Sequence, residues 1–338
     1  MLHKLKNDRC LIIAEAGVNH NGDVSIAKKL CDAAKDSGAD VVKFQTWNTD
    51  RLITRTVRMA DYQETNIGNS ETQYEMLKKL ELSRNDFIIL KDYCEKIGII
   101  FASTADESSS LDFIVDLGVP FIKVGSGEIG NISYLRHIGS KKLPVILSTG
   151  MSSLAEIDIS LTALRDGGTD DITILHCTTN YPCPYREVNL RAMKTLNDAF
   201  KLPVGYSDHT VGTEVAVAAV AMGAKVIEKH FTLDKNMIGP DHIASTEPSE
   251  FKRMVEQIRN IENALGDGIK KMTSSEKSNK KVITKRIVAS RSIDRGEYFT
   301  EKNVCVKRSM DGESASMWDY IIGKKAIHNY EKDQGILL

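Results

Sequence analysis

The sequence lacks several features that mark large classes of protein. It has no excess of either charge, because 45 lysines and arginines are balanced by 46 aspartates and glutamates, giving a formal net charge of -1. Such a chain has no overall field to attract nucleic acid or an anionic membrane surface, and we expect neither as a partner. No apolar run approaches the roughly 18 residues of a membrane span. We also expect no signal peptide, because residues 1–6 lead directly into a predicted strand.

Paired cysteines are missing as well. The six cysteines include no CxxC pair, and several lie within apolar strand or helix patterns, where they resemble small core residues. This usage is typical of a reduced, cytoplasmic protein. The chain also lacks the GxxxxGK[ST] loop that cradles nucleoside triphosphates.

What the sequence does contain is a regular alternation of strands and helices. Short β-branched runs are each followed by a helical segment that ends near glycine. The eight runs are CLIIAEA, DVVKFQT, IIFAST, FIKVGS, PVILSTG, ITILHCT, PVGYSD and KVIEKH. Eight repeats predict an α/β fold with a (β/α)8 TIM barrel over residues 1–266, rather than a doubly wound sheet, which typically has five or six strands.

The remaining residues have a different character. Residues 267–284 are rich in lysine and serine without a long apolar face, which predicts a linker. Residues 285–338 consist of short alternating runs between turn signals such as Asp294–Gly296, which predicts a small, mostly β module. A module of this size is marginally stable alone, so we expect it to pack on another surface, such as a second protomer.

Polar side chains end nearly every predicted barrel strand. Because the carboxyl ends of barrel strands form one rim, these side chains should face one site. Two lysines, Lys43 and Lys123, lie within strand patterns, where lysine is unusual. With nearby hydroxyl groups they predict a cradle for a phosphate and a carboxylate. The predicted cradle contains Lys43, Thr104, Lys123, Ser126, Ser148 and Ser207.

Two histidines end consecutive predicted strands, in PVGYSDH and AKVIEKH. A lone histidine near an apolar run is more often a hydrogen-bonded packing residue than a metal ligand. Two at equivalent strand ends, each near a carboxylate, favour a metal pair of His209 and His230. Together with Glu15, Glu128 and Asp241 they suit a hard cation and proton transfer around a carbonyl and a water.

Ordered motifs along nearly the whole chain carry a resemblance. These are AEAGVNHNGD, VKFQT, FIKVGSGE, ILSTGM, LHCTTNYPCP, EVNLRAM, GYSDHT, EKHFTLDK, GPDH and IDRGEYFTEKNVCVKR. The chain resembles the sialic acid synthase family, also called N-acetylneuraminate or nonulosonate synthases. The resemblance implies a TIM barrel followed by an antifreeze-like (SAF) domain in a domain-swapped homodimer. It also implies condensation of phosphoenolpyruvate with an N-acylated mannosamine-type sugar to a nine-carbon 2-keto acid and phosphate.

The resemblance also implies roles for individual residues. His209 and His230 match ligands of a divalent metal, commonly Mn2+, with Mg2+ and Co2+ as alternatives. Glu15 matches a residue beside the metal-bound water, and Arg308 matches a tail arginine that reaches the partner's site. The cradle residues other than Thr104 match phosphoenolpyruvate-binding positions, and the sugar-contacting positions match Gln45, Glu128, Tyr181 and Asp241.

Two segments depart from the family pattern. Members commonly have STPFD after the third strand, whereas this chain has Ser103–Glu107 with the sequence STADE, which retains Thr104. Where many members have KRPG, this chain has KRSM over Lys307–Met310.

The identity of the sugar stays open at this point. N-acetylmannosamine, its 6-phosphate and 2,4-diacetamido-2,4,6-trideoxymannose share the same reacting end. Two further alternatives are a phosphoenolpyruvate-dependent 3-deoxy-2-keto sugar acid synthase, disfavoured by the absence of a Cys-based metal site and by the tail, and a non-catalytic carbohydrate-binding protein.

Overall fold

The structure is a computed structural model that describes residues 9–67 and 72–338. Residues 1–6, on which the expectation about a signal peptide rests, lie outside the described part. The chain divides into two compact units, Met1–Gly266 and Asp267–Leu338.

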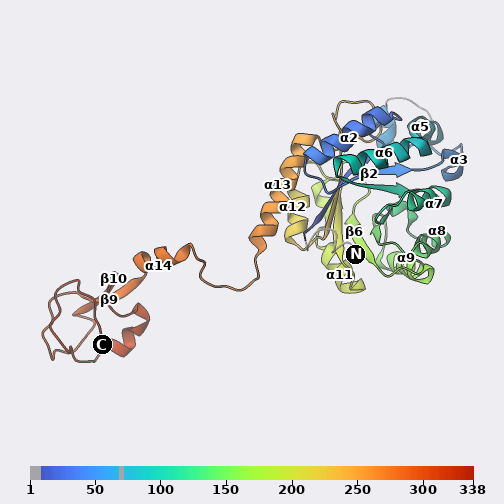
Figure 1. The fold of residues 1–338 in the computed structure, drawn as a ribbon. Coiled ribbons are helices and arrows are strands. Elements are labelled where there is room, and N and C mark those ends of the chain that lie inside the picture. Colours follow the sequence, from blue (N-terminus) through green and yellow to red (C-terminus); the bar gives the residue numbers. More distant parts are fainter. Residues whose placement is uncertain (1–8, 68–71) are drawn as a thin grey trace. The chain divides into compact units, whose positions relative to one another are not determined.

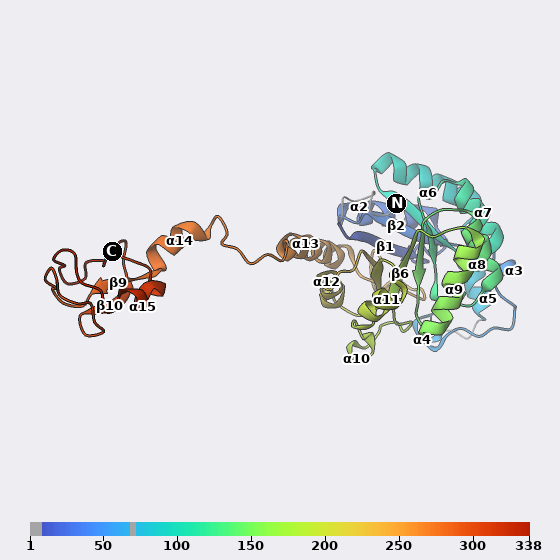
Figure 2. The same cartoon turned by 90° about the horizontal axis from the view of Figure 1, so that it is seen from below.

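The first unit is a closed barrel of eight parallel strands in sequential order, which confirms the predicted TIM barrel. Each strand is followed by at least one helix, and the helices surround the barrel (Figures 1 and 2). The strands are β1 (Leu11–Gly17), β2 (Val41–Thr46), β3 (Ile100–Ala105), β4 (Ile122–Val124), β5 (Val145–Ser148), β6 (Ile172–Cys177), β7 (Val204–Asp208) and β8 (Val226–His230).

Local sequence signals fix the ends of several helices. Thr72, Ser83 and Ser153 each form a capping box with an acidic residue three positions later. The helices of the first unit are α2 (Val24–Asp36), α3 (Thr49–Leu52), α4 (Asp61–Ile67), α5 (Gln73–Leu80), α6 (Arg84–Ile97), α7 (Ser108–Asp116), α8 (Ile132–Ser140), α9 (Leu154–Gly167), α10 (Tyr185–Val188), α11 (Ala192–Phe200), α12 (Glu214–Ala221) and α13 (Pro248–Leu265), with 3-10 turns η1 (Ser126–Glu128) and η2 (His242–Ala244).

The interior of the barrel has an apolar floor. Alternate residues of a strand point to the same face, and the residues nearer the amino ends form a separate buried apolar cluster within the barrel. Its members are Leu11, Ile13, Val41, Ala102, Phe121, Ile146, Leu175 and Val226. Gly205 of β7 faces this cluster, where an added Cβ would lie 2.6 Å from a methyl carbon of Leu175. Two residues further along several of these strands the buried side chains become polar, and this layer forms the site described below.

The second unit has its own core. Strands β9 (Lys285–Ala289) and β10 (Val304–Arg308) pair antiparallel, with Arg308 opposite Lys285. They pack with turns, with η3 (Ala315–Met317) and with α15 (Trp318–Ile321) around a cluster that includes Phe299 and Tyr330. This unit confirms the predicted small, mostly β module.

The predicted linker contains a helix that the sequence analysis did not anticipate. Helix α14 (Glu276–Ile283) begins within it, and none of its residues is buried. Its lack of a buried face explains why the apolar pattern gave no helix signal.

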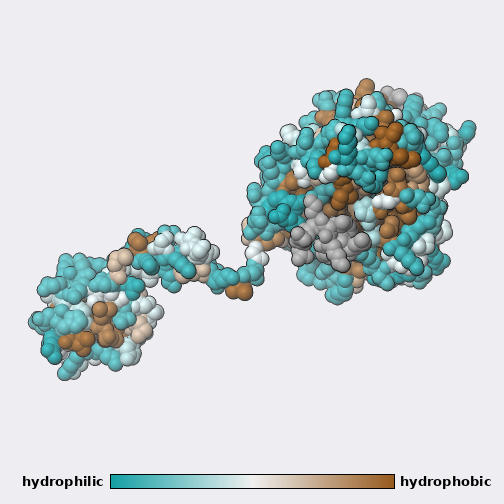
Figure 3. Space-filling view, viewed as in Figure 1, coloured by the Kyte–Doolittle hydropathy of each residue, from teal (hydrophilic) through white to brown (hydrophobic). Residues whose placement is uncertain are grey.

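The face shown in Figure 3 is mostly hydrophilic in both units, with scattered apolar residues. No helix in the described ranges is both long enough and apolar enough to span a membrane.

Candidate active site at the carboxyl end of the barrel

A pocket of about 250 Å³ opens at the carboxyl ends of the barrel strands. It brings together every predicted site residue of the barrel except Glu128. These are Glu15, Lys43, Gln45, Thr104, Lys123, Ser126, Ser148, Tyr181, Ser207, His209, His230 and Asp241. The rim expected from the strand ends is therefore one continuous surface in the structure.

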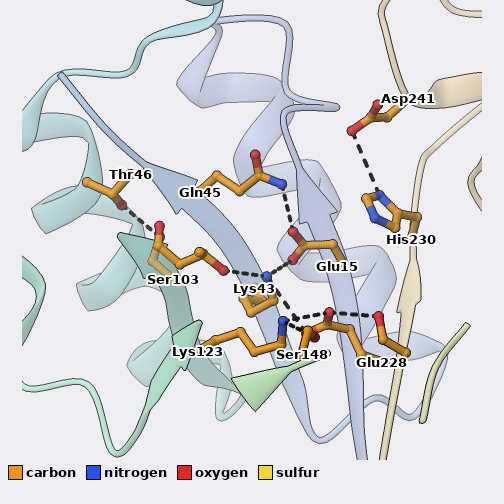
Figure 4. Close-up of polar contacts among 12 residues, drawn as sticks. Glu15, Lys43, Gln45, Thr46, Ser103, Lys123, Ser148, Glu228, His230 and Asp241 are labelled. Carbon is orange, nitrogen blue, oxygen red and sulfur yellow. Dashed lines mark hydrogen bonds and ion pairs between the residues drawn. The ribbon is translucent and has the colours of Figure 1, made fainter. Parts of the chain in front are cut away.

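Two buried lysines lie at the base of the pocket (Figure 4). Lys43 Nζ is 2.7 Å from Glu15 Oε2 and 2.9 Å from Thr104 Oγ1. Lys123 Nζ is 2.9 Å from Ser148 Oγ. Both ammonium groups also approach one further carboxylate, that of Glu228, at 3.8 Å from Lys43 and 3.2 Å from Lys123.

Glu228 is a site residue that the predicted set omitted. Burial by itself would raise the pKa of this carboxyl, but the charges of Lys123 and Lys43 outweigh burial and lower it to about 2. Burial would likewise lower the pKa of Lys43, and the Glu15 and Glu228 carboxylates raise it instead. Lys43 and Glu228 therefore stay ionised inside the barrel. The sequence alone could have identified it, because Glu228 is two residues before His230 on the same strand, and alternate residues of a strand point to the same face.

Glycines and hydroxyls complete the wall beside Lys123. Ser126 Oγ accepts a hydrogen bond from the Gly150 backbone N–H at 2.9 Å. A Cβ on Gly150 would lie 2.2 Å from Thr179 Oγ1 and 3.0 Å from Ser126 Oγ, so a larger residue there would have to displace Thr179. Residues 125–130 have the GxGxxG spacing of dinucleotide-binding loops. They follow the fourth strand of a closed barrel rather than the first strand of a doubly wound sheet, and Gly125 and Gly127 line this pocket instead.

The two histidines lie side by side, with ring centroids 5.5 Å apart. His209 Nδ1 donates a hydrogen bond to the Thr178 carbonyl at 2.7 Å, which leaves the lone pair of the neutral ring on Nε2. Among the described residues the buried His230 Nδ1 has no hydrogen-bond partner, and it is 3.9 Å from Asp241 Oδ2. Burial lowers the pKa of His209, and burial together with the neighbouring His209 lowers that of His230. Ser207 Oγ lies 3.4 Å from His209 Nε2, within hydrogen-bonding distance. The neutral imidazole is the form of histidine that binds a divalent metal, so the pair fits such an ion.

The rest of the chain adds few ligands to this pair. In the described ranges, no three His, Cys, Asp or Glu side chains are grouped so that they could hold a metal ion. Tyr181 packs against both imidazoles, with ring centroids 4.1 Å from His209 and 5.3 Å from His230. The side chains next to the pair therefore include the ring of Tyr181, the hydroxyl of Ser207 and the carboxylate of Asp241.

Glu15 lies between the lysine end and the histidine end of the pocket. Its backbone pairs with Lys43 on one side and with His230 on the other. Its Oε1 accepts a hydrogen bond from Gln45 Nε2 at 3.0 Å. Burial and the charge of Glu228 raise the pKa of Glu15, while Lys43 opposes them. A carboxyl with a raised pKa is suited to proton transfer.

Two predicted residues lie elsewhere. Glu128 is not among the residues that line the pocket, and its carboxylate accepts a 2.7 Å hydrogen bond from Asn131, the residue that caps α8. Arg308 is exposed at the end of β10 in the second unit. The pocket instead contains Asp106, which the sequence analysis did not assign to the site.

Comparisons with known proteins agree with this geometry. The NeuB family model matches residues 30–270, and the SAF domain model matches residues 285–338. The chain is 49% identical to the N,N'-diacetyllegionaminic acid synthase of Campylobacter jejuni, over 96% of this chain and 98% of that protein. It is 34% identical to the human N-acetylneuraminate-9-phosphate synthase, over 97% and 91%.

A solved structure agrees in the same way. The N-acetylneuraminic acid synthetase of Leptospira borgpetersenii, in complex with citrate, superposes with a TM-score of 0.71 at 33% identity. The match covers 81% of this chain and 90% of that one. The chain therefore belongs to the NeuB family of enzymes and carries an SAF domain after its barrel.

Proposed function

We propose that this enzyme condenses phosphoenolpyruvate with 2,4-diacetamido-2,4,6-trideoxymannose to give N,N'-diacetyllegionaminate and phosphate. The observation that carries the reaction class is a single pocket that holds both a paired-lysine cradle and two neutral histidines. The choice of sugar is supported by the higher identity to a diacetyllegionaminic acid synthase, 49%, than to an N-acetylneuraminate-9-phosphate synthase, 34%.

The lysine end binds phosphoenolpyruvate in this proposal. Lys43 and Lys123 supply fixed positive charge for its phosphate and carboxylate, and Thr104, Ser126, Ser148 and Ser207 supply hydroxyl groups. The two ammonium groups already share Glu228, so their positions are set before the substrate arrives.

The histidine end orients the sugar. His209 and His230 would hold a divalent metal, with Mn2+ as the first choice and Mg2+ or Co2+ as alternatives. When bound, the metal supplies Lewis-acid polarisation of the sugar aldehyde. Gln45, Tyr181 and Asp241 line the same part of the pocket and hold the rest of the sugar.

Bond making and breaking then follow from the substrate chemistry. C3 of phosphoenolpyruvate forms a bond to the aldehyde carbon, and the aldehyde oxygen takes up a proton to become a hydroxyl. Water adds at C2 with loss of one proton, and phosphate then leaves by cleavage of its bond to C2 as the new C2 hydroxyl loses its proton and becomes the keto group. Glu15 takes the proton from that water, because its raised pKa suits proton transfer and it lies between the two ends of the pocket.

A domain-swapped homodimer completes the proposal. Arg308 would donate hydrogen bonds to the N-acyl group of the sugar in the partner's barrel. Its exposure at the end of β10 leaves its guanidinium accessible to another subunit. A cytoplasmic location is also proposed, and it is supported by six cysteines that are all free thiols.

The test compares phosphate release from phosphoenolpyruvate with each of the three sugars, together with the mass of the product. We expect the highest kcat/KM with 2,4-diacetamido-2,4,6-trideoxymannose. A preference for N-acetylmannosamine or its 6-phosphate would correct the sugar while preserving the reaction class. Phosphate release with none of the three would contradict the proposed function.

A further inference from the structure

Asp106, in the STADE segment that departs from the family pattern, adds a carboxyl to the lining of the pocket. Its backbone N–H donates to the Thr46 carbonyl at 3.1 Å, which holds it against the end of β2. The next residue, Glu107, accepts hydrogen bonds from the backbone N–H groups of Ser109 and Ser110 and caps α7. Asp106 is therefore fixed from both sides at the rim of the barrel.

The side chain of Asp106 faces the pocket. It lies within the electrostatic reach of Lys43, Lys123, Glu15 and Glu128, the first three of which line the pocket. Burial, followed by the charge of Glu128, raises the pKa of Asp106 to about 7. Within the described ranges, the carboxyl of Asp106 accepts no hydrogen bond.

Other carboxyls of the pocket are already engaged. Glu15 and Glu228 pair with the lysines, Asp241 Oδ2 lies 3.9 Å from His230 Nδ1, and Glu128, outside the lining, accepts a hydrogen bond from Asn131. A partly buried carboxyl without a donor is costly unless a ligand supplies one. Asp106 is thus an acceptor that remains available to a bound substrate.

The pocket offers little positive charge beyond its cradle. Among the described residues that line it, Lys43 and Lys123 are the only lysines or arginines, and both already pair with carboxylates. A second phosphate, carried by the sugar, would find no barrel cation of its own. It would instead meet the carboxyls of Asp106 and Asp241.

We propose that Asp106 is a specificity-determining residue that accepts a hydrogen bond from an amide N–H or hydroxyl of a neutral sugar and disfavours phosphorylated sugars by charge repulsion. This inference rests on the proposed function, because it concerns which sugar joins phosphoenolpyruvate in the same pocket. Discrimination of this kind combines an attractive contact to one substrate with a repulsive contact to its competitor.

The test measures kcat and KM for the neutral diacetamido sugar and for N-acetylmannosamine 6-phosphate, in the wild type and in Asp106→Asn, at pH 8, where a carboxyl with a pKa of about 7 is mostly ionised. The substitution keeps the shape of the side chain and removes its charge. We expect kcat/KM for the neutral sugar to fall about tenfold, through KM of the sugar, because the amide oxygen of asparagine accepts a weaker hydrogen bond than the charged carboxylate does. The ratio of kcat/KM for the phosphorylated sugar to that for the neutral sugar should rise at least about tenfold, while KM for phosphoenolpyruvate stays within about twofold.

A matched control is Asp116→Asn, which removes an exposed carboxyl from the end of α7 and should change none of these ratios. Asp106→Ala, with melting temperatures for all variants, replaces Asp106→Asn if the latter does not fold. An unchanged substrate ratio, or equal changes in both KM values, would overturn the role of Asp106 while preserving the proposed function. A wild type that uses the sugar phosphate as well as the neutral sugar would also overturn it. Inactivity of the wild type with every sugar would instead refute the proposed function.

Discussion

Charges that are buried together explain how the base of the pocket can be both polar and stable. Lys43, Lys123, Glu15 and Glu228 are each at most 4% exposed, yet every one has an oppositely charged neighbour. Isolated burial of any of them would be costly, and pairing offsets that cost. An arriving anionic substrate can then exchange contacts with groups that are already desolvated and fixed.

The first prediction at the residue scale concerns the metal. His209→Ala or His230→Ala should lower the affinity for Mn2+ by at least about tenfold and abolish turnover, because each removes half of the proposed ligand pair. Calorimetric titration with Mn2+ measures the affinity, and circular dichroism checks that the barrel stays folded. His137→Ala, which removes a partly exposed histidine on α8 paired with Asp112, is the control. Unchanged affinity in both site variants would refute the assignment.

The second prediction concerns acid stability. His20 is fully buried beside Phe44, and burial, with a contribution from His242, lowers its pKa from 6.5 to about 4. The unfolded chain takes up this proton at a higher pH than the folded chain. The stabilisation is therefore complete above pH 6.5 and is lost as the pH falls toward 4, by roughly 3 kcal/mol.

His20→Phe keeps a ring at this position and removes the titrating group. The drop in melting temperature between pH 7.5 and pH 4.5 should be smaller in this variant than in the wild type, even if its melting temperature at pH 7.5 is lower. His137→Gln serves as the comparison at a partly exposed site. An identical drop in the wild type and in His20→Phe would show that His20 does not contribute to acid sensitivity.

At the scale of elements, the loop after β8 is held by the loop after β1. The amide of Asn19 donates to the Phe231 carbonyl and to Ser245 Oγ, both at 2.9 Å. Ser245 Oγ in turn donates to the backbone carbonyl of Asp241 at 2.6 Å. A short chain of hydrogen bonds therefore fixes the residue that faces His230, although Asn19 itself is not a lining residue of the pocket.

Asn19→Ala should consequently raise KM for the sugar about tenfold, because a buried hydrogen-bond network loses its donor. KM for phosphoenolpyruvate should change less than about twofold, since the lysine cradle lies on other strands. Steady-state kinetics with each substrate varied in turn provides the measurement. Asn197→Ala, which removes an exposed amide that donates to the Leu202 carbonyl, is the control. Equal increases in both KM values would indicate general damage instead of displacement of Asp241.

At the scale of the whole molecule, the proposed swap of SAF domains predicts complementation between inactive proteins. Arg308→Ala and His209→Ala, mixed under conditions that exchange subunits, should form heterodimers with one barrel lacking both groups and one barrel complete. Random exchange would restore about a quarter of wild-type activity. Native mass spectrometry reports the exchange, and phosphate release reports the activity.

The control mixture combines His209→Ala with Lys43→Ala. Both lesions lie in the barrel, so every barrel of every heterodimer keeps one of them and no activity should return. Exchange without recovery in the Arg308 mixture would rule out action across the interface.

The sequence by itself determined the barrel and most of the candidate site. Strand, turn and helix signals are local. Residues that face the inside of the barrel recur at every second position of a strand, as Val41, Lys43 and Gln45 do. Once the barrel was predicted, its strand ends had to meet at one rim. The second unit was likewise predictable from its turn signals.

Only the tertiary structure decided how these side chains share the pocket. Closure of the barrel places Glu228 between Lys43 and Lys123, which come from strands far apart in the chain. Glu128 accepts a local hydrogen bond from Asn131 and does not line the pocket, whereas Asp106, whose backbone bonds to the end of β2, does. Charge pairing and hydrogen bonding depend on distances across the barrel, and residue order along one strand does not specify those distances.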